Sequence, residues 1–401
     1  MNCTDRWLLP EGIEELLPPQ ARRIEALRRR LLDLYATWGY AQVVPPFIEY
    51  LESLLVGSGH DLDLETFKLT DQLTGRLMGV RADMTQQVAR IDAHRLQRDA
   101  PTRLCYLGTV LRTRPGGATG SRSPLQVGAE LYGHPGIESD AEIVALMVET
   151  LEACGIHDAH LDLGHVGIFR QLAAAAGVDE AREAELFEML QRKARPELEA
   201  ALATSGLAPE QAARLLALVD LNGGDEVLDA ARAQLAGAGP GIDAALASLA
   251  GIAVTLRQER PDLKLHFDLA ELRGYRYHTG VVFAALVPGH GEAVARGGRY
   301  DDVGRFFGRA RPATGFSADL RTLVQLGSAQ ATAAPESGIF APADADPELG
   351  AAVRELRARG ERVVRALPGQ QGGAAEMGCD RTLVRRGEAW EVRDLRDSAG
   401  Q

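Results

Sequence analysis

The sequence predicts an α+β fold built on a large antiparallel sheet with flanking helices. Residues 104–112 and 124–132 each alternate between two sets of side chains, the period of a strand with two distinct faces. Residues 263–269 alternate in the same way after a long stretch of helical composition. Long strands with helices inserted between them favour an antiparallel core over a parallel doubly wound sheet.

Composition predicts a soluble cytoplasmic protein without a metal, nucleic-acid or membrane partner. The chain has 401 residues, 45% of them hydrophobic, enough for one large core and a smaller satellite domain. Its net charge is −12 and no block of like charges stands out, which argues against a surface for phosphate backbones. We expect no signal peptide and no apolar run of roughly 20 residues that would span a membrane. The cysteines, with no metal or disulfide spacing, are Cys3, Cys105, Cys154 and Cys379.

The first elements form a helix, an edge strand and a hairpin. Apolar residues recur with helical period over 20–38, and Gly39 ends the helix. Pro45 and Pro46 restrict residues 43–48 to an edge strand or an interface segment. Residues 66–69 and 76–81 flank a turn-rich segment and predict a hairpin.

The next strands carry the polar positions of the predicted core. After the strand at 104–112, a loop rich in Gly, Ser, Pro and Arg covers 113–123. The strand at 124–132 places Gln126, Gly128, Glu130 and Tyr132 on one face, which suggests the floor of a ligand site. Ser139 is predicted to open a helix through a capping box, and a strand follows at 159–164.

The remaining segments complete the domain organisation. Residues 1–326 form the predicted core, interrupted by a mainly helical insertion at 166–253 that is rich in Ala, Leu, Glu and Gln. A hairpin is expected from 273–287 and 292–296. A Ser, Ala, Thr and Pro-rich linker at 327–337 leads to a small, truncated α/β domain at 338–401, with a helix at 347–359 and three short strands.

Six ordered motifs carry a resemblance to a known family. They are Leu-Pro-Glu-Gly at 9–12, Val-Arg-Ala-Asp-Met-Thr at 80–85, Leu-Arg-Thr-Arg-Pro at 111–115, Gln-Val-Gly-Ala-Glu at 126–130, Arg-Gly-Tyr-Arg-Tyr-His-Thr-Gly at 273–280 and Gly-Gly-Arg-Tyr-Asp at 297–301. Over residues 9–326 the chain resembles the histidyl-tRNA synthetases and, more closely, their non-catalytic relatives, the regulatory subunits of short-form ATP phosphoribosyltransferase. Each motif is weak alone, but the order makes the set specific. The resemblance implies a class II aminoacyl-tRNA synthetase-like core.

The resemblance also implies a histidine pocket. Asp83, Thr85 and Gln126 match positions that face the amino group, Glu130 matches the carboxylate that reads the imidazole, and Arg273 matches an arginine beside the substrate carboxylate. Taken singly, such residues are more often structural ion pairs or core tyrosines, so their joint match carries the prediction. The full predicted set is Asp83, Thr85, Arg112, Gln126, Glu130, Arg273, Tyr277 and Tyr300, with His278 in place of a further family tyrosine.

The catalytic parts of the family pattern are substituted. Residues 315–324 resemble the ATP-binding helix of the synthetases, but Asp319, Arg321 and Thr322 stand where that helix has glycine, glutamate and a phosphate-gripping arginine. Arg114 stands where the family has a glutamate. Since preorganised charges supply much of the rate of such reactions, we expect no catalytic residue and no cofactor. The middle of the tRNA-binding domain is also cut short at 369–377.

The resemblance therefore implies a non-catalytic subunit that binds histidine and joins a short-form ATP phosphoribosyltransferase catalytic subunit. Such a subunit serves the first step of histidine biosynthesis and its feedback inhibition, and is expected to dimerise through residues 45–50. An atypical histidyl-tRNA synthetase remains the alternative, since Arg112 and Arg273 are retained. A free-standing class II-like amino-acid ligase is a third class.

Overall fold

The computed structural model describes residues 7–56, 60–115, 120–275, 277–328 and 337–396. Cys3, Arg276 and most of the predicted linker at 327–337 lie outside these ranges. The chain divides into two compact units, Met1–Thr332 and Ala333–Gln401. Each unit is described by itself.

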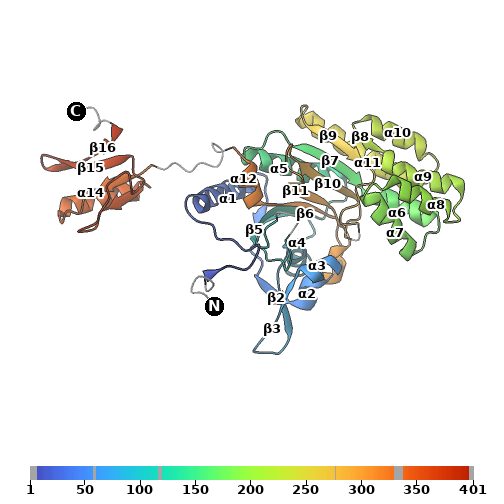
Figure 1. The fold of residues 1–401 in the computed structure, drawn as a ribbon, viewed down its shortest axis with the longest axis horizontal. Coiled ribbons are helices and arrows are strands. Elements are labelled where there is room, and N and C mark those ends of the chain that lie inside the picture. Colours follow the sequence, from blue (N-terminus) through green and yellow to red (C-terminus); the bar gives the residue numbers. More distant parts are fainter. Residues whose placement is uncertain (1–6, 57–59, 116–119, 276, 329–336, 397–401) are drawn as a thin grey trace. The chain divides into compact units, whose positions relative to one another are not determined.

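A nine-stranded sheet forms the centre of the first unit (Figure 1). Two neighbouring pairs, β1 with β5 and β7 with β9, are parallel, and the other six pairs are antiparallel. The long strands follow the predicted alternation closely. In sheet order the strands are β1 (Ala41–Gln42), β5 (Thr102–Thr109), β6 (Leu125–Tyr132), β12 (Ala313–Asp319), β11 (Ala295–Arg299), β10 (Val281–Leu286), β7 (His160–His165), β9 (Lys264–Asp268) and β8 (Asn222–Gly223).

One face of this sheet packs against long amphipathic helices. Cys105 and Leu107 of β5 and Val127 and Ala129 of β6 point to this side and join the main apolar cluster. The helices that supply the rest of the cluster include α1 (Gln20–Thr37), α5 (Ile137–Ala153), α11 (Pro240–Glu259) and α12 (Leu320–Leu326). Burial of these apolar stripes holds the layer to the sheet.

The opposite face carries a smaller cluster and the candidate ligand floor. Leu104 and Tyr106 of β5 point to this side, where they pack with Met84, Val88 and Tyr300. The covering segments are α4 (Thr85–Arg90), a π-helical turn (Ile91–Leu96) and a 3-10 turn (Val303–Phe307). A separate three-stranded sheet has the order β2 (Ile48–Tyr50), β4 (Leu77–Val80) and β3 (Phe67–Thr70), with the short helices α2 (Leu51–Leu55) and α3 (His60–Glu65) nearby in sequence.

Helices α6 to α11 occupy the stretch predicted to be a helical insertion, and Figure 1 shows the green to yellow helices gathered around the β9 and β8 end of the sheet. Contrary to the sequence prediction, one of them, α11, is long and apolar enough to cross a membrane by length and composition. A buried core helix passes the same test, and one side of α11 is packed into the main apolar cluster. The others are α6 (Val166–Ala175), α7 (Glu180–Gln191), α8 (Arg195–Ala203), α9 (Pro209–Asp220) and α10 (Glu226–Gln234).

The second unit is a small α/β domain. Its four-stranded sheet has the order β14 (Val363–Arg365), β13 (Ile339–Ala341), β15 (Arg381–Arg386) and β16 (Ala389–Asp394). Helix α14 (Pro347–Ala358) begins at Asp346, whose carboxylate accepts a hydrogen bond from the Glu348 backbone N–H. Leu349 and Val353 of α14 pack with Ile339 and Leu383 of the sheet in a modest core.

Three local predictions are wrong. Residues 315–319 belong to strand β12 instead of a helix, because they pair with both β6 and β11. Helix α5 begins after Gly136, so Ser139 lies within its first turn and donates to the His134 and Gly136 carbonyls instead of capping. Strand β10 begins only at Val281, after a turn in which the Tyr277 and His278 N–H groups both donate to the Gly274 carbonyl. Of the segment predicted to be an edge strand or an interface piece, only Ile48 lies in a strand, the edge strand β2, and the interface alternative stays a prediction.

Gly315 of β12 faces Glu130 of β6 across the sheet, and this contact allows a stability test. A Cβ at Gly315 would lie 1.5 Å from a Glu130 carboxylate oxygen, which no small adjustment relieves. We expect Gly315→Ala to lower the free energy of unfolding by about 3 kcal/mol, measured by urea denaturation. Gly291→Ala, where a Cβ meets open space, is the matched control and should change it by less than about 0.5 kcal/mol. Equal stability of the two variants would contradict this packing.

Candidate functional site

A buried carboxyl group, that of Glu130, lies at the centre of the candidate site. Its side chain, 1% exposed, projects from β6 between β5 and β12. The Tyr106 hydroxyl donates to its Oε1 at 2.9 Å, and the Tyr300 hydroxyl donates to its Oε2 at 2.5 Å. Burial raises the pKa of Glu130 to about 8, although the two tyrosine hydrogen bonds oppose that shift. The group is therefore a carboxyl that titrates near neutral pH.

Glycines make room for this carboxyl and its tyrosines. Gly315 opposes Glu130 directly, and Gly128 opposes Tyr106. A Cβ at Gly128 would lie 2.5 Å from both the Tyr106 hydroxyl and the Phe316 carbonyl oxygen. At these two positions, the absence of a side chain on the neighbouring strand leaves room for Glu130 and Tyr106.

Asp83, Thr85 and Gln126 form a polar group beside Glu130. The Asp83 carboxylate accepts from the Thr85 backbone N–H at 2.6 Å and from the Gln126 amide at 2.8 Å. The Gln126 carbonyl in turn accepts from the Met84 backbone N–H at 2.9 Å, which fixes the orientation of the amide. The Thr85 hydroxyl lies 3.2 Å from that of Tyr106 and so connects this group to Glu130.

Tyr277 closes the site from the loop between β9 and β10. Its ring stacks on that of Tyr300, with centroids 5.1 Å apart. The Tyr277 hydroxyl is buried, yet no described group hydrogen-bonds to it. His278 turns away, with Nδ1 3.3 Å from the Arg299 carbonyl oxygen, and burial lowers its pKa to about 4. A buried hydroxyl without a partner is costly and marks a place where a ligand atom fits.

The two predicted arginines lie apart from the Glu130 cluster. Arg112 donates from Nε to the Ala82 carbonyl at 3.3 Å, next to Asp83 in the chain. Arg273 is about half exposed, and its Nε lies 3.5 Å from Glu271. Arg296 is affected by both: its pKa is lowered by partial burial and by the neighbouring cations Arg273 and Arg112. The guanidinium groups of Arg112 and Arg273 therefore lie close enough to repel that of Arg296, while Glu65 pairs with Arg112 and Glu271 with Arg273.

The predicted site set left out Tyr106, and it left out Tyr132 although the sequence had placed Tyr132 on the polar face of its strand. Tyr106 holds Glu130 directly, and the Tyr132 hydroxyl lies 3.3 Å from that of Tyr300. A signal was present, because Tyr132 shares the polar face of β6 and Tyr106 shares the strand period of β5. Cross-strand register, which sequence alone does not give, is needed to place them beside Glu130.

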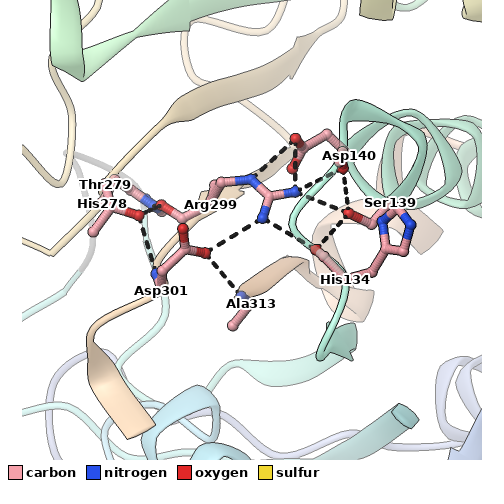
Figure 2. A network of polar contacts seen from close by, with 9 residues as sticks. His134, Ser139, Asp140, His278, Thr279, Arg299, Asp301 and Ala313 are labelled. Atoms are coloured by element: carbon pink, nitrogen blue, oxygen red, sulfur yellow. Dashed lines mark hydrogen bonds and ion pairs between the residues drawn. The ribbon is translucent and has the colours of Figure 1, made fainter. Parts of the chain in front are cut away.

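A second polar network anchors the strand that leads to Tyr300 (Figure 2). The buried Arg299 donates to Asp140 at 2.9 Å, to the Ser139 hydroxyl at 2.8 Å and to the Gly136 carbonyl at 3.1 Å. It also reaches Asp301 at 3.3 Å, whose carboxylate accepts from the Ala313 N–H. The network joins α5, β11 and β12. It therefore fixes the backbone position immediately before Tyr300.

The end of β12 shows what replaced the family's ATP-binding residues. Asp319 caps α12 by accepting from the Arg321 backbone N–H at 3.1 Å, and it also accepts from the Leu125 N–H at 3.0 Å. The Thr322 hydroxyl donates to the same carboxylate at 3.2 Å. The substituted residues thus bond to one another, and the negative charge of Asp319 is directed at the helix N-terminus.

Among the described residues, no group of three or more His, Cys, Asp or Glu side chains is arranged to hold a metal ion. The described cysteines Cys105, Cys154 and Cys379 are buried and free. Within the described residues, the candidate site therefore consists of polar and charged side chains.

Comparison with known proteins identifies the family. Residues 12–323 match the family model of histidyl-tRNA synthetase, and residues 336–393 match that of the ATP phosphoribosyltransferase subunit HisZ C-terminal domain. The ATP phosphoribosyltransferase regulatory subunit of Thioalkalivibrio sulfidiphilus is 64% identical over 98% of this chain and 100% of its own length. That of Alkalilimnicola ehrlichii is 61% identical over 98% of both chains. The chain belongs to the ATP phosphoribosyltransferase regulatory subunits.

Solved structures agree with this placement. A crystal structure from Bacillus halodurans, described as an ATP phosphoribosyltransferase regulatory subunit/histidyl-tRNA synthetase, has a TM-score of 0.81 and 28% identity, covering 92% of this chain and 95% of its own. Histidyl-tRNA synthetase from Nostoc has a TM-score of 0.78 at 22% identity, covering 98% and 95%, and shares the fold. The predicted class II synthetase-like fold and the predicted regulatory subunit are confirmed, and the synthetase alternative is not favoured. This regulatory subunit is the non-catalytic member of an enzyme complex.

The raised pKa of Glu130 predicts how the stability of this regulatory subunit depends on pH. The folded state holds the Glu130 proton more tightly than the unfolded chain, whose pKa is near 4.5. The resulting stability is complete below pH 4.5 and is lost as pH rises through about 8. We therefore expect the melting temperature of the wild type to fall, relative to Glu130→Gln, by roughly 5 °C between about pH 5 and about pH 9. Parallel pH profiles of the two proteins would rule out a perturbed Glu130.

Proposed function

We propose that this subunit is a histidine sensor, which binds histidine at the Glu130 site and passes its occupancy to a short-form ATP phosphoribosyltransferase catalytic subunit in the cytoplasm. Its role is feedback inhibition of the first step of histidine biosynthesis. The observation that carries the proposal is the Tyr277 hydroxyl, buried without a partner beside the buried carboxyl of Glu130. A ligand with a polar ring atom supplies what that hydroxyl lacks.

The charges around the site match the three polar parts of histidine. Asp83, with Thr85 and Gln126, offers a half-buried carboxylate and its hydrogen-bonding neighbours to an ammonium group. Glu130 and Tyr277 offer a titrating carboxyl and a free hydroxyl to the imidazole. The neighbouring guanidinium groups of Arg112, Arg273 and Arg296 suit a carboxylate. An amino acid with a basic ring has the ammonium group, the ring and the carboxylate that these three parts of the site match.

The regulatory role requires that histidine bind one state of the assembly more tightly than another, since equal affinity would shift no equilibrium. The relatives named above are regulatory subunits of ATP phosphoribosyltransferase, which supports a catalytic partner for this chain. The histidine pocket of the subunit then makes the activity of the complex depend on histidine.

Calorimetry of the full chain with L-histidine tests the pocket. We expect the wild type to bind and Asp83→Asn to bind at least about tenfold more weakly, because it loses the charge that faces the ammonium group. Glu130→Ala should abolish inhibition by histidine of the complex reconstituted with the catalytic subunit, while assembly, followed by size-exclusion chromatography, stays intact.

Glu210→Gln, at an exposed position of α9, is the control and should match the wild type. Full inhibition of the Glu130→Ala complex would refute the pocket assignment. Binding of ATP with Mg²⁺ followed by histidine-dependent pyrophosphate release would return the chain to the synthetases.

Self-association is proposed through the segment around Pro45 and Pro46. Val44 is 80% exposed, Phe47 45% and Ile48 42%, so this short segment shows three large apolar side chains to solvent. β2 is also an edge strand of its three-stranded sheet. An apolar group on an open edge favours contact with a second copy.

We expect Phe47→Asp to shift the subunit from dimer to monomer in light scattering at micromolar concentration, because a charge in the contact is costly to bury. Leu73→Asp, at a 95% exposed position of the β3–β4 turn, is the control and should leave the mass unchanged. A dimer that survives Phe47→Asp would place the contact elsewhere.

A further inference from the structure

The loop between β9 and β10 carries two tyrosines that contact different parts of the subunit. Tyr277 stacks on Tyr300, which holds Glu130. Tyr275, two residues earlier, packs between Phe169 of α6 and Phe187 of α7, with each ring centroid 5.4 Å away. One short segment therefore contacts both the ligand site and the helical insertion.

Polar contacts fix Tyr275 to the insertion as well. Its hydroxyl donates to Glu183 of α7 at 2.6 Å. Arg170 of α6 lies over its ring, with the guanidinium carbon 4.8 Å from the centroid. The same Arg170 donates to the Tyr275 carbonyl at 2.7 Å and to the His278 carbonyl at 3.1 Å. The insertion thus grips the backbone on both sides of Tyr277.

Backbone hydrogen bonds tie Tyr277 to the residue before Tyr275. The backbone N–H groups of Tyr277 and His278 both donate to the Gly274 carbonyl, at 2.7 and 2.8 Å. Gly274 has a φ of +68°, a left-handed conformation that favours glycine. A displacement of Tyr277 therefore acts on the backbone beside Tyr275 through Gly274, and on the Tyr275 carbonyl through Arg170, which also holds the His278 carbonyl.

Space for movement exists where the loop meets the end of α7. A pocket of about 380 Å³ lies there, lined by Gln191 and Lys193 at that end and by Glu271 and Arg273 of the loop. Lys193 bridges it through an ion pair of 2.6 Å with Asp268 of β9. Close-packed junctions resist displacement, whereas an open pocket spanned by an ion pair allows α7 to shift against the sheet.

We propose that Tyr275 is a positioning residue that couples occupancy of the Glu130 site to helices α6 and α7. The insertion is then the part of the subunit that responds to histidine, an inference that rests on the histidine site proposed above. Tyr277 senses the ligand, and Tyr275 transmits its position to Glu183 and Arg170. Binding and transmission are carried by different residues of one loop.

Hydrogen exchange of the full-length wild type, with and without histidine, tests the response. Histidine should slow exchange in 166–191, although these helices do not line the Glu130 site. This measurement needs no variant. Exchange that histidine leaves unchanged in α6 and α7, while histidine binds, would overturn the inference and leave the sensor proposal standing.

Tyr275→Phe separates transmission from binding, because it keeps the ring between Phe169 and Phe187 and removes only the hydrogen bond to Glu183. We expect its affinity for histidine by calorimetry to stay within about threefold, whereas the histidine concentration for half inhibition of the reconstituted complex rises by about fivefold to tenfold. Glu183→Gln, which keeps an acceptor, should behave nearly as the wild type. Glu188→Gln, exposed on the same helix, is the neutral control.

The outcomes distinguish the two proposals. Wild-type inhibition retained in Tyr275→Phe would overturn the coupling alone. Equal losses of binding and inhibition would show Tyr275 to be merely structural and would also overturn it. Absence of histidine binding by the wild type would overturn both proposals.

Discussion

The hydrogen bonds between the Glu130 carboxyl and the Tyr106 and Tyr300 hydroxyls are the constraint on which this face of the sheet depends. A carboxyl that is 1% exposed is tolerable only when its oxygens have partners and its charge is titratable. Gly315 follows from that need, because a Cβ at this position of β12 would collide with the Glu130 carboxylate. A group kept at this energetic cost in the middle of a core is better explained by recognition than by stability.

Two of the residues that stand in place of the family's ATP-binding residues, Asp319 and Thr322, have local partners, and the fold of the family is retained. Asp319 stands where the synthetase family has a residue near the triphosphate. In this chain it caps the N-terminus of α12, where the helix dipole and the backbone N–H groups of Arg321 and Leu125 stabilise its charge. The proposed amino-acid site lies on β6 and α4, and its Gln126 pairs directly with Asp319 at the end of β12. The Gln126 amide nevertheless bonds to Asp83 and to the Met84 N–H and not to the Asp319 carboxylate, so the polar group of the proposed site is built without the substituted residues.

The sequence was sufficient to predict the main strands, because the alternation of side chains along β5, β6 and β9 indicates which of them are buried. It also placed Asp83, Gln126 and Glu130 in one site, since the ordered motifs fix their family positions. It failed where tertiary contacts outweigh local signals: Ser139 has the spacing of a cap, but Arg299 and the Gly136 turn start the helix earlier. Tyr106 was missed because only cross-strand register brings it to Glu130.

The proposed separation of histidine sensing from response has a physical reason in the layout of this subunit. A ligand as small as an amino acid contacts few groups, so its differential binding energy must be concentrated on an element that adopts a second position. Strand β6, which carries Glu130, is paired with a strand on each side and is close-packed, so it is a poor candidate for such movement. The loop of Tyr275 and Tyr277 lies outside the strand ladder, where ring packing, turn hydrogen bonds and Arg170 hold it, and its Arg273 end lines an open pocket. A floor held by the sheet and a loop outside the sheet that borders a pocket are together the arrangement that the proposed switch requires.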